Sequence, residues 1–495
     1  MILPDNTPDS PTKSRAGPPS ALSEETHEDR LPPPPAYPGH PYQYRSVDIE
    51  AQAGTSTSRT SLRQRPGPPP VHHIEAFEPP LRRFLKAFGV AVLIYIVLAS
   101  FTRTVVAGIH WETGRRDVQF PLPRTSDGRP ISCSSASHRN VIVSASNAMP
   151  VTTFLVPLSA DLLHIWGRGA LSHGTINFRP STDRSIPEGS VRVDITPRDY
   201  STEALQSVNI CLLEPAANQR SIGILTPKKW WSTEKINFTV DVFFPVSPWK
   251  SAPLHVKAIE TNLPLFTHVF SKLEGKVAFD SLKAYSSNMP IHGDYVDVES
   301  AKIVTSNARI DGKFRVSRSL ELQTSNQHID TEVVLDYDAL SQGDASTNLT
   351  LHNSNGLIHS KISLRTASPF GIGGFYAVSA STQNGAVDLS FPEQPVDSTL
   401  TLSARTSNSP AMVRLNPAFE GQFELGTANG PVTFAPDKNV ADPAHRGRTR
   451  SWMLSERTMR AWRGLVTWGF PNDPDRNLKG WARVETLNDM VELRV

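Results

Sequence analysis

Two pairs of neighbouring carboxylates are the residues of this sequence best placed to do chemistry. Asp336 and Asp338 form one pair, and Asp473 and Asp475 form the other. Two carboxylates poised differently on one strand face could act as acid and base in polysaccharide cleavage. Because an Asp-x-Asp sequence in a polar loop is more often simply solvated, we expect a protein that is not an enzyme. A carbohydrate-active enzyme is kept as an alternative.

The common catalytic and cofactor signatures are absent from the sequence. The segment from Gly169 to Gly174 holds Ser172 and His173, but its spacing differs from that of a Gly-x-Ser-x-Gly nucleophile elbow, so we expect loop residues there. There is no His-Glu-x-x-His, Cys-x-x-Cys, Walker loop or dinucleotide fingerprint. We therefore expect neither a metal ion nor a cofactor.

The composition argues for a globular chain with a separate tail. The 495 residues carry 50 Lys and Arg against 48 Asp and Glu, a net charge of +2, so charge alone indicates no nucleic-acid partner. With 38% hydrophobic and 20% charged residues and 2 Cys, the chain is unlike a disulfide-rich miniprotein, a coiled coil or a polytopic membrane protein.

Residues 1–80 hold 17 of the 42 prolines and few aliphatic side chains. Such a segment buries too little apolar surface to offset its ordering entropy, so we expect a disordered, Pro-rich tail. Its sharpest motif is the Pro-Pro-x-Tyr sequence of Pro34, Pro35 and Tyr37, which resembles ligands of WW domains. Prolines preset the extended backbone and the tyrosine fills a pocket, so a WW-domain protein is a candidate partner of the tail.

One apolar run predicts a membrane-spanning helix over residues 84–106. Residues 87–102 are free of charge and span roughly 24 Å as a helix, and flanking Lys86 and Arg103 extend the usable length. The run begins too far from residue 1 for a cleaved signal peptide, so we expect an uncleaved signal anchor in a lipid bilayer.

The flanking charges predict the orientation of this anchor. Arg82, Arg83 and Lys86 precede the run and Arg103 follows it, which places the tail in the cytosol and residues after the span in the lumen or outside the cell. We expect a plasma, secretory or vacuolar membrane.

Two further features are consistent with a lumenal C-terminal part. The sequons at Asn237 and Asn348 both follow the span, as do Cys133 and Cys211. An oxidising compartment permits one disulfide, and two buried unpaired thiols are the alternative.

A short pattern recurs from residue 251 to the C-terminus. It reads Thr or Ser, any residue, Asn, two residues, then Val or Ile, at spacings near 20 residues with insertions. Alternating apolar and polar residues flank each copy and predict strands. The asparagines of the six full copies are Asn288, Asn307, Asn326, Asn384, Asn429 and Asn488, and two degenerate copies contain Asn355 and Asn408.

A period of this length predicts stacked β-units, because one unit cannot bury its own apolar face. We expect an all-β fold with a parallel β-solenoid-like repeat domain, in which the asparagines align at one corner and bond from rung to rung. Asn-Gly dipeptides are explained by tolerance of positive φ. Since Asn-Gly also favours hairpins, a β-sandwich is the alternative.

The strand, Thr-x-Asn-Gly-x-Val, strand pattern resembles the adhesin-like β-repeat domain of bacteria and fungi. The similarity covers roughly residues 255–495, and the plan of tail, span and ectodomain is similar to uncharacterised fungal single-pass proteins. This resemblance implies a β-solenoid-like fold without an established activity and supplies no catalytic residues.

Residues 110–250 are less regular, but they contain strand-like runs near 190–195, 208–213 and 236–244, so we expect a β-rich cap on the first rung. Residues 436–480 interrupt the last repeat, and we expect a polar loop with room for one short helix. This insertion is solvated or contacts an anionic partner through Arg446, Arg448, Arg450, Arg457, Arg460 and Arg463.

Tryptophans pack in the core or line a sugar-binding surface; they include Trp166, Trp230, Trp231, Trp462 and Trp468.

The expected function is binding, adhesion or scaffolding by the β-repeat ectodomain, with a glycan or protein as ligand. A membrane-trafficking or ubiquitin-ligase adaptor that acts through its tail is the second alternative, beside the carbohydrate-active enzyme.

Overall fold

The computed structural model of the chain describes residues 121–135, 150–228, 236–247, 249, 252–437, 439–469 and 480–495. The predicted tail, the predicted span, and the motif residues Pro34, Pro35 and Tyr37 lie outside these ranges, as do Trp230, Trp231, Asp473 and Asp475. Within the described ranges, no helix is long and apolar enough to cross a membrane.

The described chain is almost entirely β-structure, as the alternating pattern predicts. Its N-terminal part contains η1 (Thr125–Asp127), β1 (Arg129–Ser135), β2 (Thr152–Pro157), β3 (Leu162–Arg168), β4 (His173–Ser181), β5 (Ser190–Arg198), α2 (Thr202–Gln206), β6 (Asn209–Glu214), β7 (Gln219–Leu225) and β8 (Asn237–Pro245). The middle part contains β9 (Leu254–Asn262), β10 (Leu265–Phe270), β11 (Val277–Tyr285), β12 (Ile291–Val304), β13 (Ile310–Gln323), β14 (Ile329–Tyr337), α3 (Ala339–Gln342), β15 (Thr347–His352), β16 (Ile358–Thr366), β17 (Phe375–Ser381) and β18 (Val387–Glu393). The C-terminal part contains β19 (Thr399–Arg405), β20 (Ala411–Arg414), β21 (Gly421–Gly426), β22 (Val432–Ala435), β23 (Arg450–Arg457), β24 (Ala461–Trp468), β25 (Gly480–Glu485) and β26 (Val491–Arg494).

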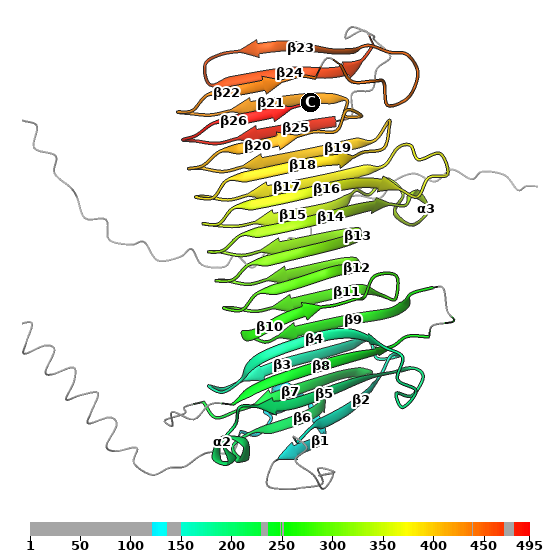
Figure 1. Ribbon diagram of the computed structural model, residues 1–495, viewed down its shortest axis with the longest axis vertical. Coiled ribbons are helices and arrows are strands. Elements are labelled where there is room, and N and C mark those ends of the chain that lie inside the picture. Colours follow the sequence, from blue (N-terminus) through cyan, green and yellow to red (C-terminus); the bar gives the residue numbers. More distant parts are fainter. Residues whose placement is uncertain are drawn as a thin grey trace, which may run out of the picture. The chain divides into compact units, whose positions relative to one another are not determined.

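The strands form two sheets that enclose one core and are stacked rung upon rung (Figure 1). The first sheet runs β2, β5, β8, β4, β10, β12, β13, β14, β16, β18, β20, β26, β22. The second sheet runs β1, β6, β7, β3, β9, β11, β12, β13, β15, β17, β19, β25, β21, β24, β23. Pairing is parallel throughout the middle of the stack, and the antiparallel pairing of a hairpin meander occurs only at its two ends.

The apolar residue three positions after each corner asparagine forms a continuous column in the core. Parallel register places these side chains directly above one another, and all are buried except Val432 on the last rung, which is half-buried. Burying one aliphatic side chain contributes roughly 1.5–3 kcal/mol. The column therefore explains why the repeat requires Val, Ile or Ala at this position: Ile291, Ile310, Ile329, Ile358, Val387, Ala411 and Val491.

The opposite corner accounts for the variable length of the repeat. In β12 and β13 the chain crosses this corner without a break and contributes to both sheets. Later rungs carry connections there at 338–346, 367–374, 394–398 and 415–420. These insertions lengthen the spacing between asparagines without disturbing the asparagine corner.

The last two repeats do not stack in chain order. The C-terminal strands β25 and β26 lie between the rung of β19 and β20 and the rung of β21 and β22. The N-terminal end shows a similar inversion, because β3 and β4 lie between β7 with β8 and β9 with β10. In Figure 1 these interleaved rungs precede the antiparallel strands that close each end.

The Arg-rich insertion differs from the loop that the sequence predicts. Residues 450–457 and 461–468 form the antiparallel hairpin of β23 and β24, and β24 pairs with β21. Alternation in this segment is masked by its many arginines, whose aliphatic stems and charged ends fit a half-exposed strand. The hairpin extends the second sheet beyond the last rung.

Candidate functional site at the asparagine corner

Eight asparagines form an unbroken ladder along one corner of the stack. Each side-chain amide donates from Nδ2 to Oδ1 of the asparagine on the preceding rung, over seven bonds of 2.6–2.8 Å. The ladder passes from Asn408 to Asn488 and then back to Asn429, following the spatial order of the rungs. All eight side chains are exposed, so this corner is a surface feature as well as a structural one.

The residue two positions before each corner asparagine is buried and closes the same corner from the core side; it is Thr on six rungs, Ser286 on one and Asn353 on another. Thr324 donates to the Ala308 carbonyl over 2.9 Å, and Thr406 donates to the Gly385 carbonyl over 2.8 Å. Both side chains are buried, so the bonds satisfy hydroxyls that water cannot reach. The Thr-x-Asn spacing thus supplies one inner and one outer bond per rung.

The glycine that follows several corner asparagines has a different role from the one expected. Gly356, Gly385 and Gly430 do not have positive φ. A Cβ atom at these positions would lie 2.1, 1.9 and 1.9 Å from a carbonyl oxygen of the preceding rung. Close backbone approach between rungs, and not left-handed geometry, therefore excludes a side chain.

A column of imidazoles and carboxylates lies beside the ladder on the outer face of the first sheet. Register aligns His292, Asp311, Asp330, His359 and Asp388 on consecutive rungs. His359 Nδ1 lies 2.8 Å from Asp330 Oδ1, and His292 Nδ1 bonds Asp311. Each of the two histidines thus forms a hydrogen bond with a carboxylate on an adjacent rung.

The pKa of His292 reflects this arrangement. Partial burial alone would lower the pKa, but hydrogen bonds to Asp311 and Asp294 outweigh burial, and the pKa of His292 is raised. Its charged form is therefore favoured on the folded protein.

A shallow groove of about 370 Å³ opens between the β14 and β16 rungs at this corner. Amide, imidazole and carboxylate groups converge on it around one exposed aliphatic side chain, Leu357. The groove is lined by Asn326, Gln327, His328, Asp330, Gly356, Leu357 and His359.

The carboxylates singled out in the sequence have other partners. Asp336 forms an ion pair with Arg315 and lies opposite Arg365, and Asp338 caps α3 by accepting a hydrogen bond from the Leu340 amide over 3.0 Å. Arg365 in turn pairs with Glu393 over 2.8 Å. Alternating charges on successive rungs thus hold Asp336 in an ion-pair ladder.

The other candidate residues are distributed over the domain. Ser172 is buried in the turn between β3 and β4, where it forms no nucleophile elbow. Asn348 is exposed on β15, whereas Asn237 is half-buried on β8 and lies opposite Arg198 of β5. In the described residues, no three His, Cys, Asp or Glu side chains are placed to hold a metal ion.

The described tryptophans differ in exposure: two are buried, Trp452, Trp462 and Trp481 are half-buried, and Trp249 is exposed. Trp166 is buried and donates from Nε1 to Ser221 Oγ over 2.8 Å, and Trp468 is buried and donates to the Pro417 carbonyl over 2.9 Å. Trp462 is half-buried in the C-terminal hairpin. These positions do not form a flat aromatic surface.

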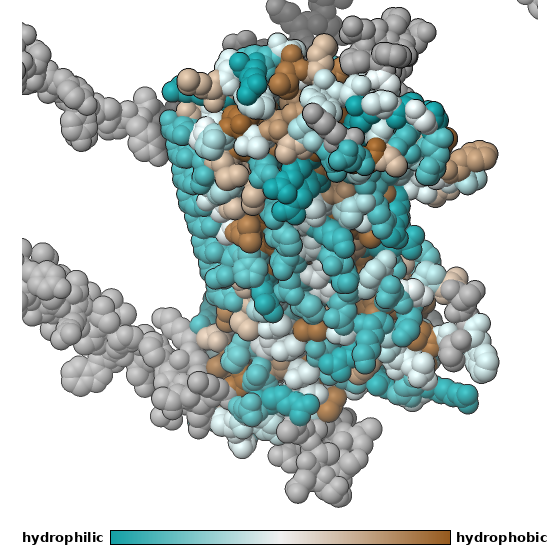
Figure 2. Space-filling view, turned by 45° about the horizontal axis from the view of Figure 1, so that its top comes forward, coloured by the Kyte–Doolittle hydropathy of each residue, from teal (hydrophilic) through white to brown (hydrophobic). Residues whose placement is uncertain are grey.

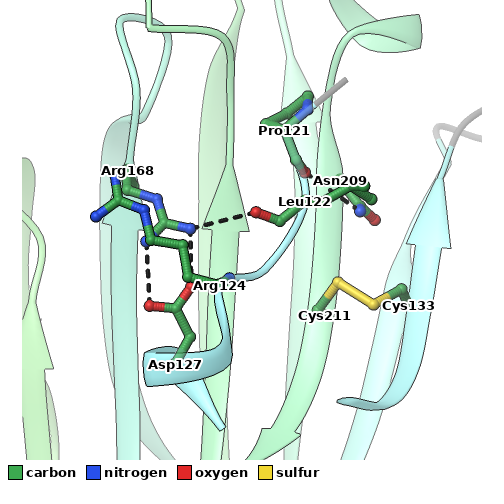
Figure 3. The surroundings of a disulfide bond; sticks show 8 residues. All are labelled: Pro121, Leu122, Arg124, Asp127, Cys133, Arg168, Asn209 and Cys211. Atoms are coloured by element: carbon green, nitrogen blue, oxygen red, sulfur yellow. Dashed lines mark hydrogen bonds and ion pairs between the residues drawn. A yellow bond between two sulfur atoms is a disulfide. The ribbon is translucent and has the colours of Figure 1, made fainter. Parts of the chain in front are cut away.

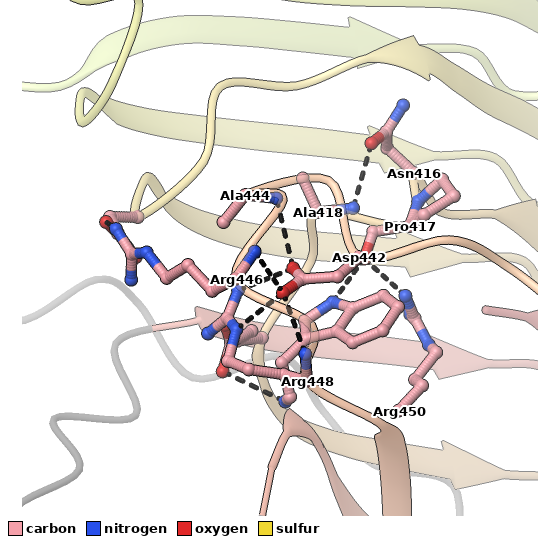
Figure 4. A network of polar contacts seen from close by, with 11 residues as sticks. Asn416, Pro417, Ala418, Asp442, Ala444, Arg446, Arg448 and Arg450 are labelled. Atoms are coloured by element: carbon pink, nitrogen blue, oxygen red, sulfur yellow. Dashed lines mark hydrogen bonds and ion pairs between the residues drawn. The ribbon is translucent and has the colours of Figure 1, made fainter.

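Three of the six arginines of the insertion, Arg446, Arg448 and Arg463, pair with carboxylates, and Figure 4 shows Arg446 and Arg448 beside Asp442. Arg448 contacts both Asp442 and Glu420, and these bonds together with backbone amides hold the pKa of Asp442 far below its usual range. Arg463 pairs with Glu424 over 2.7 Å, and Arg446 pairs with Asp397 over 3.0 Å.

Arg450 is buried against Trp468, with its guanidinium carbon 5.3 Å from the ring centroid. Burial lowers the pKa of Arg450 to about 10. Arg457 and Arg460 are exposed, and the guanidinium carbon of Arg457 lies 4.6 Å from the centroid of the Trp462 ring.

The two cysteines meet at the N-terminal end of the second sheet (Figure 3). Cys133 on β1 and Cys211 on β6 occupy opposite positions in an antiparallel pair and form a disulfide, with Cα atoms 4.0 Å apart. Cys133 is exposed and Cys211 is buried.

The fold and the corner together define a class: a parallel, solenoid-like β-stack with a surface of ordered polar columns. Figure 2 shows such hydrophilic side chains covering most of one face. Residues 299–464, about a third of the chain, match a family model described only as a domain of unknown function, DUF7330. No curated protein matches the chain.

Among solved structures, the chain is similar to a proposed cell adhesion protein from Clostridium sporogenes. The sequences are 7% identical, the TM-score is 0.15, and the match covers 70% of this chain and 99% of that chain. A likeness of this size carries no argument about function.

Proposed function

We propose that the β-stack is a non-catalytic binding domain of the adhesion type, whose ligand is an extended, hydroxyl-rich polymer such as a glycan. The observation that carries this proposal is the exposed asparagine ladder. An amide has two N–H donors and an oxygen with two lone pairs, and the ladder uses one of each on an interior rung. One donor and one acceptor per rung therefore face solvent, repeated at about 4.8 Å.

The neighbouring groove gives this surface a point of higher specificity. His359 is oriented by Asp330 through its Nδ1, so its Nε2 is the nitrogen available to a ligand. Gln327 and His328 add further polar groups to the same groove, and Leu357 supplies an apolar contact for the carbon face of a sugar ring. Side chains that are already held in place lose little conformational entropy when a ligand binds. A polymer that forms many weak contacts along the corner can therefore bind with useful affinity.

We further propose that the domain is presented outside the cytosol by the predicted anchor. The uncharged run at residues 87–102 and its flanking cations support this placement. The WW motif at Tyr37 would then face the cytosol. A pull-down with WW domains, repeated with Tyr37→Ala, tests that end of the molecule.

The binding proposal is tested by retention of the detergent-solubilised full chain on a panel of immobilised, insoluble polysaccharides. We expect His359→Ala to reduce retention at least about fivefold, as loss of one hydrogen-bonding group costs about 1 kcal/mol or more. His352→Ala is the matched control, because His352 is an exposed histidine on the second sheet that bonds Ser381 and lies outside the groove. Retention on no polysaccharide, or equal loss in both variants, would contradict the proposal.

The carbohydrate-active alternative lacks a comparable observation. Asp336 is held by Arg315, and Asp338 is used as a helix cap, so neither carboxylate is set apart for acid or base catalysis.

A further inference from the structure

The segment 121–135, here called the strap, lies on the outer face and edge of the second sheet. Its contacts all run to β3 and β6. Arg168 pairs with Asp127 over 2.8 Å and donates to the Leu122 carbonyl over 3.4 Å, while Arg129 pairs with Glu214 over 2.6 Å. Figure 3 shows the strap passing beside Arg168 and Asn209 before it reaches the disulfide.

The strap covers a small apolar patch that is separate from the main core. Trp166, Cys211, Leu213 and Leu225 form this patch. Alternate residues of β3 and β6, such as Ile165 and Ile210, belong to the main core, so Trp166 and Cys211 face outward. Beneath the strap there is therefore an apolar surface and, on β6, a strand edge that β1 pairs.

The strap itself contributes little to the core. The described side chains of β1 are exposed or half-exposed, and none is buried. Its retention rests on strand pairing, two exposed or partly exposed ion pairs and the disulfide. Surface ion pairs contribute only about 0–1 kcal/mol each, so the disulfide is the main restraint.

We propose that the β6 edge and its apolar patch are a strand-docking site that accepts the strap of a second copy of this chain. The strap and the site are complementary in strand pairing, in charge and in the position of their cysteines. Among the described residues, the partners of the strap lie on β3 and β6, so the strap of a second copy meets the same edge, the same Arg168 and Glu214, and the same Cys211. The proposal is independent of the proposed glycan binding.

The exchange needs only a low-molecular-weight thiol. Its thiolate attacks the exposed Cys133 sulfur, the Cys133–Cys211 bond breaks, and Cys211 leaves as a thiolate. The Cys211 thiolate of another copy then attacks the mixed disulfide on Cys133 and expels the small thiol. One disulfide bond within a chain becomes one between chains, with no net oxidation or reduction.

Concentration decides which form is populated. Closure within one chain does not depend on protein concentration, whereas pairing between two copies does. Exchange therefore becomes extensive only where copies are crowded or where closure within the chain is blocked.

The test blocks closure within the chain. Full-length Cys133→Ser and Cys211→Ser variants, carrying different tags, are mixed in a buffer of small thiol and its disulfide. We expect a covalent dimer containing both tags on a non-reducing gel, and mass spectrometry should identify a Cys133–Cys211 linkage. Far-UV circular dichroism verifies that both variants retain β-structure.

A matched pair of strap variants separates docking from random thiol chemistry. Asp127→Ala with Arg129→Ala in the Cys211→Ser chain removes the strap's side of both ion pairs, and we expect at least a threefold slower rate of hetero-dimer formation. Asp280→Ala, at a distant exposed pair with His255, should leave the rate unchanged. Formation only of Cys133–Cys133 dimers, or a rate insensitive to the strap changes, would overturn the proposal, as would failure of an alkylating agent to reach Cys211 in the Cys133→Ser variant.

Discussion

The order of the last rungs can be tested by cysteine pairs placed along the asparagine ladder. In the structure, Asn488 bonds both Asn408 and Asn429, so the rung of residues 480–494 lies between two rungs that are neighbours in sequence. Asn408→Cys combined with Asn488→Cys should therefore form a disulfide under mild oxidation. Asn408→Cys combined with Asn429→Cys should not.

The expected difference follows from strand spacing. Adjacent strands lie about 4.8 Å apart, whereas strands two rungs apart are separated by roughly 9.6 Å. A disulfide needs Cα atoms about 4.4–6.8 Å apart, so only the first pair is within reach. Positions 408 and 488 are 80 residues apart, and closing a loop of that length raises the free energy of unfolding by at most about 4.5 kcal/mol.

The assay combines peptide mass spectrometry, which identifies the linked cysteines, with urea denaturation in the oxidised and reduced states. Asn429→Cys with Asn488→Cys is the positive control, because these positions are also adjacent. Efficient linkage of positions 408 and 429, without linkage of 408 and 488, would mean that the rungs follow chain order and would refute the interleaved arrangement.

Three further predictions concern individual side chains. Burial lowers the pKa of His268 to about 4. The unfolded chain therefore takes up this proton first as pH falls, and stability should drop by up to about 3 kcal/mol between pH 6.5 and pH 4, with a smaller drop for His268→Gln in urea denaturation. Asn384→Ala removes two ladder bonds and should cost about 1–2 kcal/mol in the same assay, because both partners are exposed and regain water; an unchanged midpoint would show that the ladder adds no stability. In microsomes, an endoglycosidase-sensitive mass shift should disappear with Asn348→Gln and persist with Asn237→Gln, since only the former acceptor is exposed; absence of any shift would contradict lumenal placement.

The asparagine corner is the part of the structure that the local sequence predicts best. Thr-x-Asn and the apolar residue three positions later specify an inner bond, an outer bond and a core contact on most rungs. These are contacts between equivalent positions of successive units, so the repeat alone predicts their alignment.

The sequence predicted the roles of individual residues less well than it predicted the repeat. The Asn-Gly pairs suggest positive φ, but Gly356 and Gly385 are required by the nearness of a carbonyl on the preceding rung. The arginines of residues 446–463 suggest an anionic partner, but three of the six pair with carboxylates, two of which, Glu424 and Asp397, lie far away in the sequence. Such partners lie close only after the chain has folded.

The sequence by itself determined an all-β, repeating architecture and the residues that face one another at its corner, because both follow from periods of 2 and about 20 residues. Tertiary structure alone decided which rungs are neighbours at the two ends and that Cys133 lies opposite Cys211. The physical reason is that the free edge of one parallel rung presents the same backbone donors and acceptors as that of any other. Local sequence therefore leaves the stacking order open, and the path of the connecting chain selects it.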